Sequence, residues 1–273
     1  MERTNERGIY IVLGMHRSGT SLVAGLLHKS GITMGTSRNF IPRPNEENPK
    51  GFFENFEFRK LNDDILENSG YVVKSWNPRM KEVRVNWIHK QRMKRLITKY
   101  SRKYRKWGWK DPRQMLTCDK WFAVIQELGL EKIVRIILVY RHPLSVAISM
   151  TRRGNIGTIS HGLALWFLYN QHAVEFMEES LIPCLVLSFE RIFDDQRSVL
   201  SDLSQFVGVD IDKETFNEFV SPDLVRSDFR NSDMNLDIRC DDKVTKLLER
   251  LSVLETRSCY RGLPCVWPGS EAR

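Results

Sequence analysis

The strongest constraint on the fold is a glycine-bounded loop between a predicted strand and a predicted helix. Residues 9–13 form a short apolar run with several β-branched side chains, and residues 20–28 form an apolar, helix-forming stretch. Between them lies GMHRSGTS, residues 14–21, which has the G-x4-G frame of a phosphate-binding loop. In this position the backbone N–H groups and the helix dipole favour an anion. The loop therefore predicts an anion site at the edge of a sheet.

Further strands alternate with helices along the chain. Residues 133–140 and 184–189 are apolar runs of strand length, and Pro143 suits the first turn of a helix that follows the earlier run. Helical patterns cover residues 114–128, 160–179, 196–207 and 243–254. Such alternation indicates βαβ units. We therefore expect an α/β fold, a P-loop-like three-layer sandwich around a central, mainly parallel sheet.

The composition is that of one globular domain. The chain has 273 residues, of which 41% are hydrophobic and 28% charged, and no linker or internal repeat divides it. We therefore predict a single domain over residues 1–273. The N-terminus is polar and no apolar run could span a bilayer, so we expect no transmembrane segment and a cytoplasmic location. Neither the composition nor the motifs indicate an oligomeric state.

The cysteines indicate neither disulfides nor a metal site. There are five, an odd number, and they are scattered without CxxC or Cys/His spacing. We interpret them as reduced thiols that pack in the interior, and we expect no bound metal.

Basic residues are concentrated in one segment. The formal charge is +8, and residues 79–113 contain 14 Lys and Arg against Glu82 and Asp111. Six apolar side chains of the run 81–106 lie near one helical face: Val85, Ile88, Leu96, Ile97, Tyr100 and Tyr104. Two interpretations remain open, a solvated helix that covers the core and a wall of the cleft for an anionic glycan or peptide. Nucleic acid is less favoured because no known nucleic-acid module accompanies the charge.

The loop differs from that of nucleoside-triphosphate-binding proteins at one position. Thr20 replaces the lysine that would neutralise the β- and γ-phosphates, and Arg17 provides a cation inside the loop instead. The motif RSGTS after an apolar strand closely resembles the 5′-phosphosulfate loop of the sulfotransferases that depend on 3′-phosphoadenosine 5′-phosphosulfate (PAPS). The resemblance implies that PAPS is the co-substrate. It assigns the phosphosulfate to Arg17, Ser18, Gly19, Thr20 and Ser21.

A second element of that family is an arginine at a strand end, followed eight residues later by a serine. Arg141 and Ser149 in VYRHPLSVAIS have this spacing. The resemblance implies that both bind the 3′-phosphate of PAPS. The strand end would place Arg141 at the carboxyl edge of the sheet, where open α/β folds bind ligands, and the helix would bring Ser149 to the same side.

Two further motifs imply catalytic residues by resemblance. Lys110 in WGWKDPR resembles a lysine of tyrosylprotein and bacterial carbohydrate sulfotransferases, and a cation there would stabilise charge on the leaving phosphate. Glu54 in NPKGFFEN resembles the general base of bacterial members, and Phe52 and Phe53 would partly desolvate its carboxylate. His16 in the loop is the alternative base.

The resemblance implies transfer of a sulfuryl group to an acceptor hydroxyl and release of adenosine 3′,5′-bisphosphate. It favours a carbohydrate acceptor, with a small metabolite or a tyrosine as alternatives. Two positions depart from the family pattern. Leu22 replaces the tryptophan that stacks on adenine in many small-molecule enzymes, and the C-terminal basic loop has only a weak counterpart in residues 221–227, where Arg226 is the candidate 3′-phosphate ligand.

Two other functions stay open at this point. The first is a P-loop kinase or nucleotidase, against which the missing loop lysine and the pair of Arg141 and Ser149 argue. The second is a non-enzymatic, basic protein that binds polyanions through residues 79–113.

Overall fold

The computed structural model of the protein describes residues 6–46, 48–79, 81–180, 182–220 and 241–261. Within these ranges a sheet of four parallel strands, in the order β2-β1-β3-β4, forms the centre of the molecule. The strands are β1 (Gly8–Leu13), β2 (Lys106–Lys110), β3 (Val134–Tyr140) and β4 (Cys184–Ser188).

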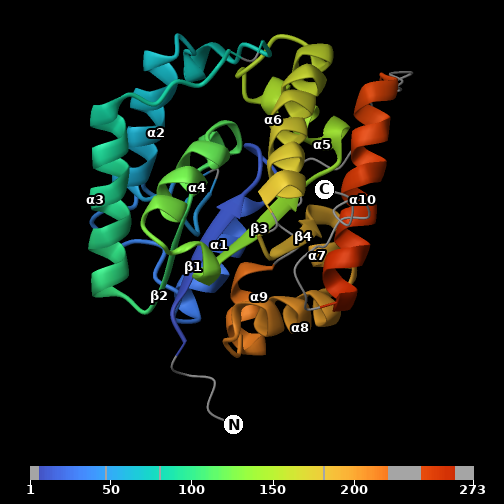
Figure 1. Ribbon diagram of the computed structural model, residues 1–273. Helices are drawn as coiled ribbons and strands as arrows, with labels where there is room; N and C mark the ends of the chain where they lie inside the picture. The colour runs from blue at the N-terminus through green and yellow to red at the C-terminus, as the bar shows by residue number, and fades with distance from the viewer. Residues whose placement is uncertain (1–5, 47, 80, 181, 221–240, 262–273) are drawn as a thin grey trace, which may run out of the picture.

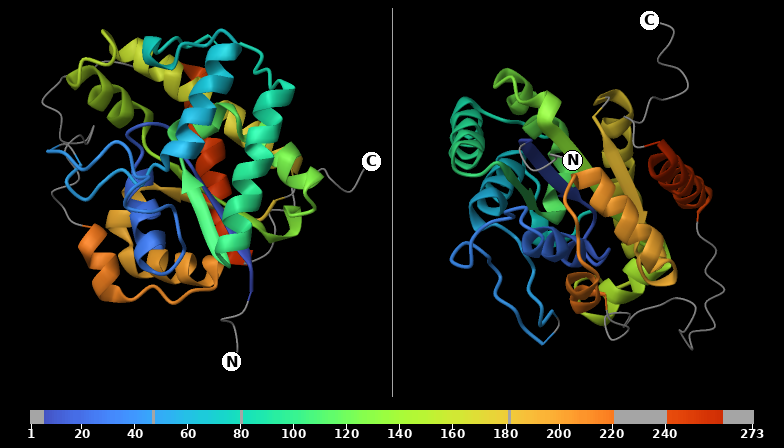
Figure 2. Two further views of the ribbon diagram at one scale, coloured as in Figure 1. Left: turned by 90° about the vertical axis from the view of Figure 1, so that its left-hand side faces the viewer. Right: turned by 90° about the horizontal axis from the view of Figure 1, so that it is seen from below.

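Helices cover both faces of this sheet (Figures 1 and 2). One face carries α1 (Thr20–Lys29), α7 (Phe189–Asp194), α8 (Gln196–Val207) and α9 (Lys213–Phe219). The other carries α2 (Phe56–Asn68), α3 (Trp87–Lys103), α4 (Cys118–Glu127), α5 (Pro143–Arg152), α6 (Ile159–Ser180) and α10 (Asp242–Arg261). Single turns of 3-10 helix are η1 (Val73–Ser75), η2 (Pro112–Leu116) and η3 (Glu131–Ile133). The predicted α/β sandwich with a parallel sheet is thus confirmed.

The strands bury side chains on both faces, because successive residues of a strand point to opposite sides. In β1, Ile9 and Ile11 pack in the core beneath α2 to α6, whereas Tyr10 and Val12 pack in the core beneath α1. A strand that is buried on both faces has an apolar run without alternation. This is why β1, β3 and β4 could be predicted to within one residue at each end.

The order of the strands fixes where a ligand can bind. The chain passes from β1 to β2 on one side and then crosses to β3 on the other side. Between β1 and β3 the loops that follow the two strands therefore diverge, and they leave a crevice at the carboxyl edge of the sheet. The glycine-bounded loop and Arg141 follow these two strands directly.

Strand β2 was not predicted from the sequence. Its residues, KWGWK, resemble a continuation of the basic helix before it. In the structure Trp107 and Trp109 are buried on one face, and Gly108 pairs with Tyr10 of β1. A Cβ on Gly108 would lie 1.9 Å from the carbonyl oxygen of Tyr10, so a side chain at this position would prevent the close approach of the two strands.

The basic helix is shorter than residues 81–106, and this expectation was wrong at both ends. It begins at Trp87, because the side chain of Asn86 caps it by accepting a hydrogen bond from the N–H of His89 at 2.9 Å. It ends at Lys103, and β2 follows after two residues. Ile88, one of the six apolar side chains expected near one helical face, is 60% exposed.

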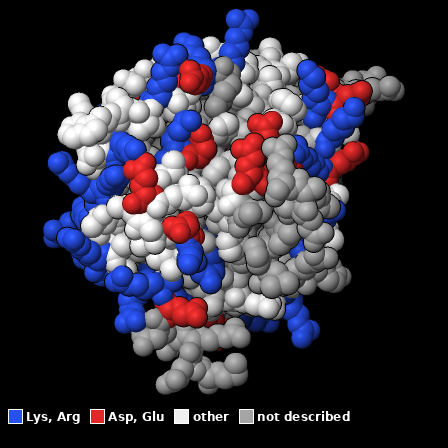
Figure 3. Space-filling model, viewed as in Figure 1, with Lys and Arg blue, Asp and Glu red and all other residues white. Residues whose placement is uncertain are grey.

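Many cations of α3 form ion pairs with neighbouring helices. Lys90 and Lys94 both contact Glu127 of α4, at 2.5 Å and 3.0 Å, and Arg92 contacts Asp64 of α2 at 2.6 Å. Figure 3 shows many basic side chains along the left-hand edge of the molecule, where α3 lies in Figure 1. These contacts favour the interpretation of α3 as a solvated helix that covers the core.

Four other expectations concern membrane spans, the cysteines, the number of domains and the location. Among helices in the described ranges, none is both long and apolar enough to cross a bilayer. Cys118 and Cys184 are buried, as expected for packing residues. The single domain over residues 1–273 and the cytoplasmic location stay predictions.

One buried asparagine attaches α2 to the segment after β2. The side-chain N–H groups of Asn62 donate to Asp111 at 2.9 Å and to Gln114 at 3.1 Å. Its carbonyl oxygen accepts from Thr117 at 2.9 Å and from the indole of Trp121 at 2.7 Å. Asn62 is fully buried, so each of these polar groups depends on the network for its hydrogen bonds.

We predict that Asn62→Ala lowers the free energy of unfolding by about 2–4 kcal/mol, because it leaves several buried polar groups without partners. Asn68→Ala, at the exposed end of the same helix, is the matched control and should cost less than about 0.5 kcal/mol. Urea denaturation of both variants measures the difference. Equal losses would mean that the network does not hold α2 in place.

Candidate active site

The glycine-bounded loop gives α1 an N-terminus that is open to an anion. Gly19 caps the helix with a left-handed φ of 88°, and a Cβ there would lie 2.4 Å from the ring of Phe189. No side chain caps the first turn of α1, and that turn contains no acidic residue. Its N–H groups and the positive end of the helix dipole therefore favour a negatively charged ligand.

Hydrogen bonds join the loop to the two residues predicted for the 3′-phosphate. The Nε of Arg17 donates to the hydroxyl of Ser149 at 2.9 Å, and the carbonyl oxygen of Arg17 accepts from Nη1 of Arg141 at 3.3 Å. Arg141 is only 4% exposed, and its guanidinium stacks over the ring of Phe189 at 4.3 Å. The structure thus brings Arg17 together with Arg141 and Ser149, which lie 124 and 132 residues further along the chain.

Lys110 lies at the carboxyl end of β2 and connects the loop to Glu54. Its Nζ donates to Glu54 Oε1 at 2.8 Å, to the hydroxyl of Ser21 at 3.2 Å and to the carbonyl oxygen of Phe52 at 3.3 Å. Lys110 is 3% exposed and Glu54 is 6% exposed. The two predicted catalytic residues therefore form a buried ion pair beside the glycine-bounded loop.

A strained backbone and aromatic packing direct Glu54 into the site. Phe53 has a φ of 52°, which is rare for a residue with a bulky side chain. Its ring packs against Phe40 at 5.3 Å and Phe219 at 5.8 Å, away from the carboxylate of the next residue. Polar groups surround this carboxylate, because Lys110 and Arg113 lie within 4 Å of it. The expectation that Phe52 and Phe53 desolvate Glu54 does not describe this environment.

Arg113 is a residue of the site that the sequence analysis did not select. Its guanidinium lies 3.8 Å from Glu54, 2.7 Å from Asp111 and 2.6 Å from Asp63 of α2. It stands three residues after Lys110, in the turn that Pro112 begins. Its role could not be recognised from the sequence, because it is one of 14 Lys and Arg in residues 79–113 and nothing in the local pattern distinguishes it from the others.

His16 lies against two aromatic rings, Trp76 at 4.9 Å and Tyr169 at 6.3 Å between centroids. Burial lowers the pKa of His16 well below its usual value, and the charges of Arg113 and Lys110 lower it further. The imidazole is therefore neutral near pH 7. A lowered pKa makes this imidazole a weaker base than an ordinary histidine, which argues against His16 as the general base.

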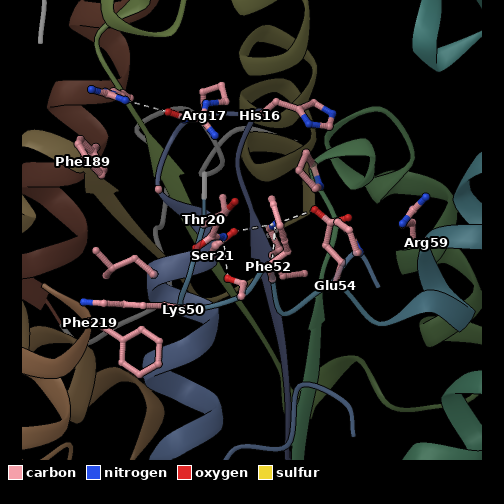
Figure 4. Close-up of a pocket in the computed structure, with 18 of the residues that line it drawn as sticks. His16, Arg17, Thr20, Ser21, Lys50, Phe52, Glu54, Arg59, Phe189 and Phe219 are labelled. Atoms are coloured by element: carbon pink, nitrogen blue, oxygen red, sulfur yellow. Dashed lines mark hydrogen bonds and ion pairs between the residues drawn. The ribbon is translucent and has the colours of Figure 1, made fainter. Parts of the chain in front are cut away.

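A cavity of about 350 Å³ lies over these residues (Figure 4). Each of the four strands contributes a residue at or after its carboxyl end to the lining: Arg17 after β1, Lys110 at the end of β2, Arg141 after β3 and Phe189 after β4. Its other lining residues include Thr20, Ser21, Leu22, Lys50, Phe52, Glu54, Arg59, Arg113 and Phe219. Among the described lining residues none comes from α3, so the cavity gives no support to α3 as a wall of the cleft.

Two predicted serines are buried and are not among the described residues that line the cavity, namely Ser18 at 1% and Ser149 at 3% exposed. Ser149 is connected to the cavity through its hydrogen bond with Arg17. Arg226, the weak candidate for the 3′-phosphate, lies outside the described residues.

Comparisons with known proteins agree with this geometry. The sequence model described as "Sulfotransferase family" matches residues 10–213. No curated protein matches the chain. Among solved structures, the sulfotransferase domain from the Synechococcus PCC 7002 olefin synthase aligns with a TM-score of 0.57 and 17% identity, over 92% of this chain and 97% of that one.

A second solved structure with the same fold is the sulfotransferase domain from the curacin biosynthetic pathway. Its TM-score is 0.52 at 15% identity, and the alignment covers 91% of this chain and 99% of that one. At such identities the likeness concerns the fold. The family match includes the glycine-bounded loop, Lys110 and Arg141, and it spans well over half of the sequence, so the chain belongs to the sulfotransferase family.

Proposed function

We propose that this protein transfers a sulfuryl group from PAPS to an acceptor hydroxyl. The observation that carries the proposal is the position of Lys110, whose Nζ contacts both the hydroxyl of Ser21 in the phosphate-binding loop and the carboxylate of Glu54. One buried cation is thereby placed between a donor site and a base. Sulfuryl transfer requires this juxtaposition, since charge develops on the donor while the acceptor loses a proton.

The proposed donor site extends from the loop to the end of β3. The N-terminus of α1 and the side chain of Arg17 suit the 5′-phosphosulfate, and Arg141 with Ser149 suits the 3′-phosphate. The aromatic side chains of Phe189 and Phe219 line the same end of the cavity, on the left in Figure 4. We assign the adenine ring to this end, where these rings would provide the apolar contact that Leu22 cannot supply by stacking.

In the proposed reaction the acceptor oxygen attacks the sulfur of PAPS in line with the bridging oxygen. A bond forms between the acceptor oxygen and sulfur, and the bond from sulfur to the bridging oxygen breaks with its electron pair on the phosphate. The acceptor proton passes to Glu54, and adenosine 3′,5′-bisphosphate leaves. Lys110 stabilises the negative charge that develops on the phosphate. Because this charge appears only as the bond to sulfur breaks, the stabilisation lowers the free energy of the transition state.

The ion pair couples these two roles. Lys110 and Arg113 lie 2.8 Å and 3.8 Å from the carboxylate of Glu54. In the proposed reaction Lys110 is therefore next to both the base and the leaving phosphate, which links removal of the acceptor proton to departure of the leaving group.

The family branch and the acceptor are also proposals. The resemblance of the segments around Lys110 and Glu54 to bacterial enzymes favours a carbohydrate, and a small metabolite or a tyrosine is the alternative. The kinase or nucleotidase alternative is weaker, because Thr20 stands where a β- and γ-phosphate site needs a lysine.

We predict that Glu54→Gln lowers turnover by about 10²–10⁴-fold while binding of adenosine 3′,5′-bisphosphate is retained. The amide preserves the shape of the side chain but accepts no proton. Glu57→Gln is the matched control, since Glu57 lies three residues further on and contacts Lys99 and Tyr100 instead. Near-normal turnover of Glu54→Gln in a steady-state assay with PAPS would place the base elsewhere.

We predict that Arg141→Ala weakens binding of adenosine 3′,5′-bisphosphate by about 1.5–3 kcal/mol, the range expected for a charge-assisted contact. Binding of adenosine 5′-phosphosulfate, which lacks the 3′-phosphate, should change much less. Calorimetric titration compares the two ligands, with Arg135→Ala at the other end of β3 as the control. Equal losses for both ligands would place Arg141 outside the 3′-phosphate site.

A further inference from the structure

Helix α10 carries a buried acidic residue on an apolar face. Four apolar side chains of this helix pack in the core at helical spacing: Val244, Leu247, Leu251 and Leu254. Glu255 lies beside them and is 8% exposed. An apolar residue is usual in such a position, because a carboxylate that leaves water loses its hydration. The helix packs against β4, and it follows residues 10–213, which match the family model.

The partners of Glu255 are the last residues of two neighbouring strands. Its Oε2 accepts a hydrogen bond from the hydroxyl of Tyr140, at the end of β3, at 2.8 Å. Its Oε1 accepts from the backbone N–H of Ser188, at the end of β4, at 2.7 Å and from the hydroxyl of the same residue at 3.2 Å. Tyr140 and Ser188 are also opposite each other in the sheet. Glu255 therefore bridges the carboxyl ends of β3 and β4 from outside the sheet.

Each bridged residue directly precedes a residue of the proposed donor site. Arg141 follows Tyr140, and Phe189 follows Ser188. The guanidinium of Arg141 stacks over the ring of Phe189 at 4.3 Å, so the relative position of the two strand ends determines this stack. Both residues line the large cavity, whereas Glu255 is not among its described lining residues.

The hydroxyl of Ser188 extends the bridge into α7. It donates to Glu255, and it caps α7 by accepting from the backbone N–H of Arg191 at 3.2 Å. Its orientation is fixed because it donates and accepts at the same time. Phe189 is the first residue of the helix that begins at this cap, and its ring also lies against Gly19 of the glycine-bounded loop.

A cation near Glu255 does not explain the burial of this carboxylate. Nη1 of Arg191 lies 3.8 Å from Glu255 Oε1, whereas Nη2 of the same guanidinium lies 2.7 Å from Asp202 of α8. The shorter contacts of Glu255 are those with Tyr140 and Ser188. Its carboxylate is thus directed at the two strand ends.

We infer that Glu255 is a positioning residue of the donor site, which holds Arg141 where the 3′-phosphate binds without contacting the nucleotide itself. The inference rests on the proposed function. It goes further because it gives α10, which lies outside the segment that matches the family model, a role in recognition of the nucleotide.

The test measures how much the 3′-phosphate contributes to binding. Calorimetric titration of the full chain compares adenosine 3′,5′-bisphosphate with adenosine 5′-monophosphate, which lacks only the 3′-phosphate. Glu255→Ala should lower the ratio of the two affinities about tenfold, because Arg141 is no longer held in place. Tyr140→Phe removes only the hydroxyl that joins Glu255 to β3, and it should lower the ratio about threefold or more. This second variant decides the outcome if Glu255→Ala does not fold.

Ser258→Ala is the control for a merely structural role of α10. Ser258 lies one turn after Glu255 and accepts from the backbone N–H of Val186, in the middle of β4, at 3.1 Å. Its loss should lower stability but leave the ratio of affinities unchanged. A ratio that is unchanged in the test variant, or lowered equally by Ser258→Ala, would overturn the inference.

A double-mutant cycle with Arg141→Ala tests whether Glu255 acts through Arg141. In that background Glu255→Ala should change the ratio by less than about twofold, because the group that it positions is already absent. A further tenfold loss would mean that Glu255 does not act through Arg141. If adenosine 3′,5′-bisphosphate does not bind the unmodified protein, the proposed function fails, and the inference fails with it. Normal binding with no effect of the variants refutes the inference alone.

Discussion

The site depends above all on four parallel strands that end at the same edge of the sheet. Parallel pairing places the glycine-bounded loop, Lys110, Arg141 and Phe189 around one cavity, although they are distributed over much of the chain. The close approach of β1 and β2, which only Gly108 permits, determines how near Lys110 lies to the loop. The network of Asn62 then fixes α2 against the turn that follows β2. The sheet thus positions Lys110 and Arg141, and the segments next to it position Arg17 and Glu54.

The buried pair of Lys110 and Glu54 is better explained by chemistry than by stability. Removing two charges from water costs free energy that their mutual attraction only partly offsets, and apolar side chains often stabilise such positions equally well. The φ of Phe53 adds a local cost in the same segment. In the proposed reaction both costs have a purpose, because they hold a base and a cation at the place where a proton leaves and negative charge develops.

The sequence was informative where one pattern determined one structure. Strands buried on both faces have long apolar runs that are easy to identify. The spacing of Gly14 and Gly19 located the loop between a strand and a helix. The hydrogen bond between Arg17 and Ser149 could not be derived from the sequence, because the two residues are far apart along the chain. The family resemblance nevertheless predicted that both contact the donor. Strand β2 was not predicted because KWGWK has charged ends and a central glycine, which are unusual in a strand. The glycine is needed because the backbone of Tyr10 in β1 leaves no room for a side chain, a contact that the local sequence does not reveal. Arg113 was missed because its importance comes from Asp63 of α2, a contact that no local pattern contains.

If the crevice between β1 and β3 binds a 3′-phosphorylated nucleotide, a thermal-shift comparison of two nucleotides will distinguish this ligand from a nucleoside triphosphate. A ligand at 100 times its dissociation constant stabilises the folded protein by about 2.7 kcal/mol. Adenosine 3′,5′-bisphosphate should therefore raise the unfolding temperature by several degrees, whereas ATP with Mg²⁺ should leave it nearly unchanged. Stabilisation by ATP with Mg²⁺ and none by adenosine 3′,5′-bisphosphate would contradict the account.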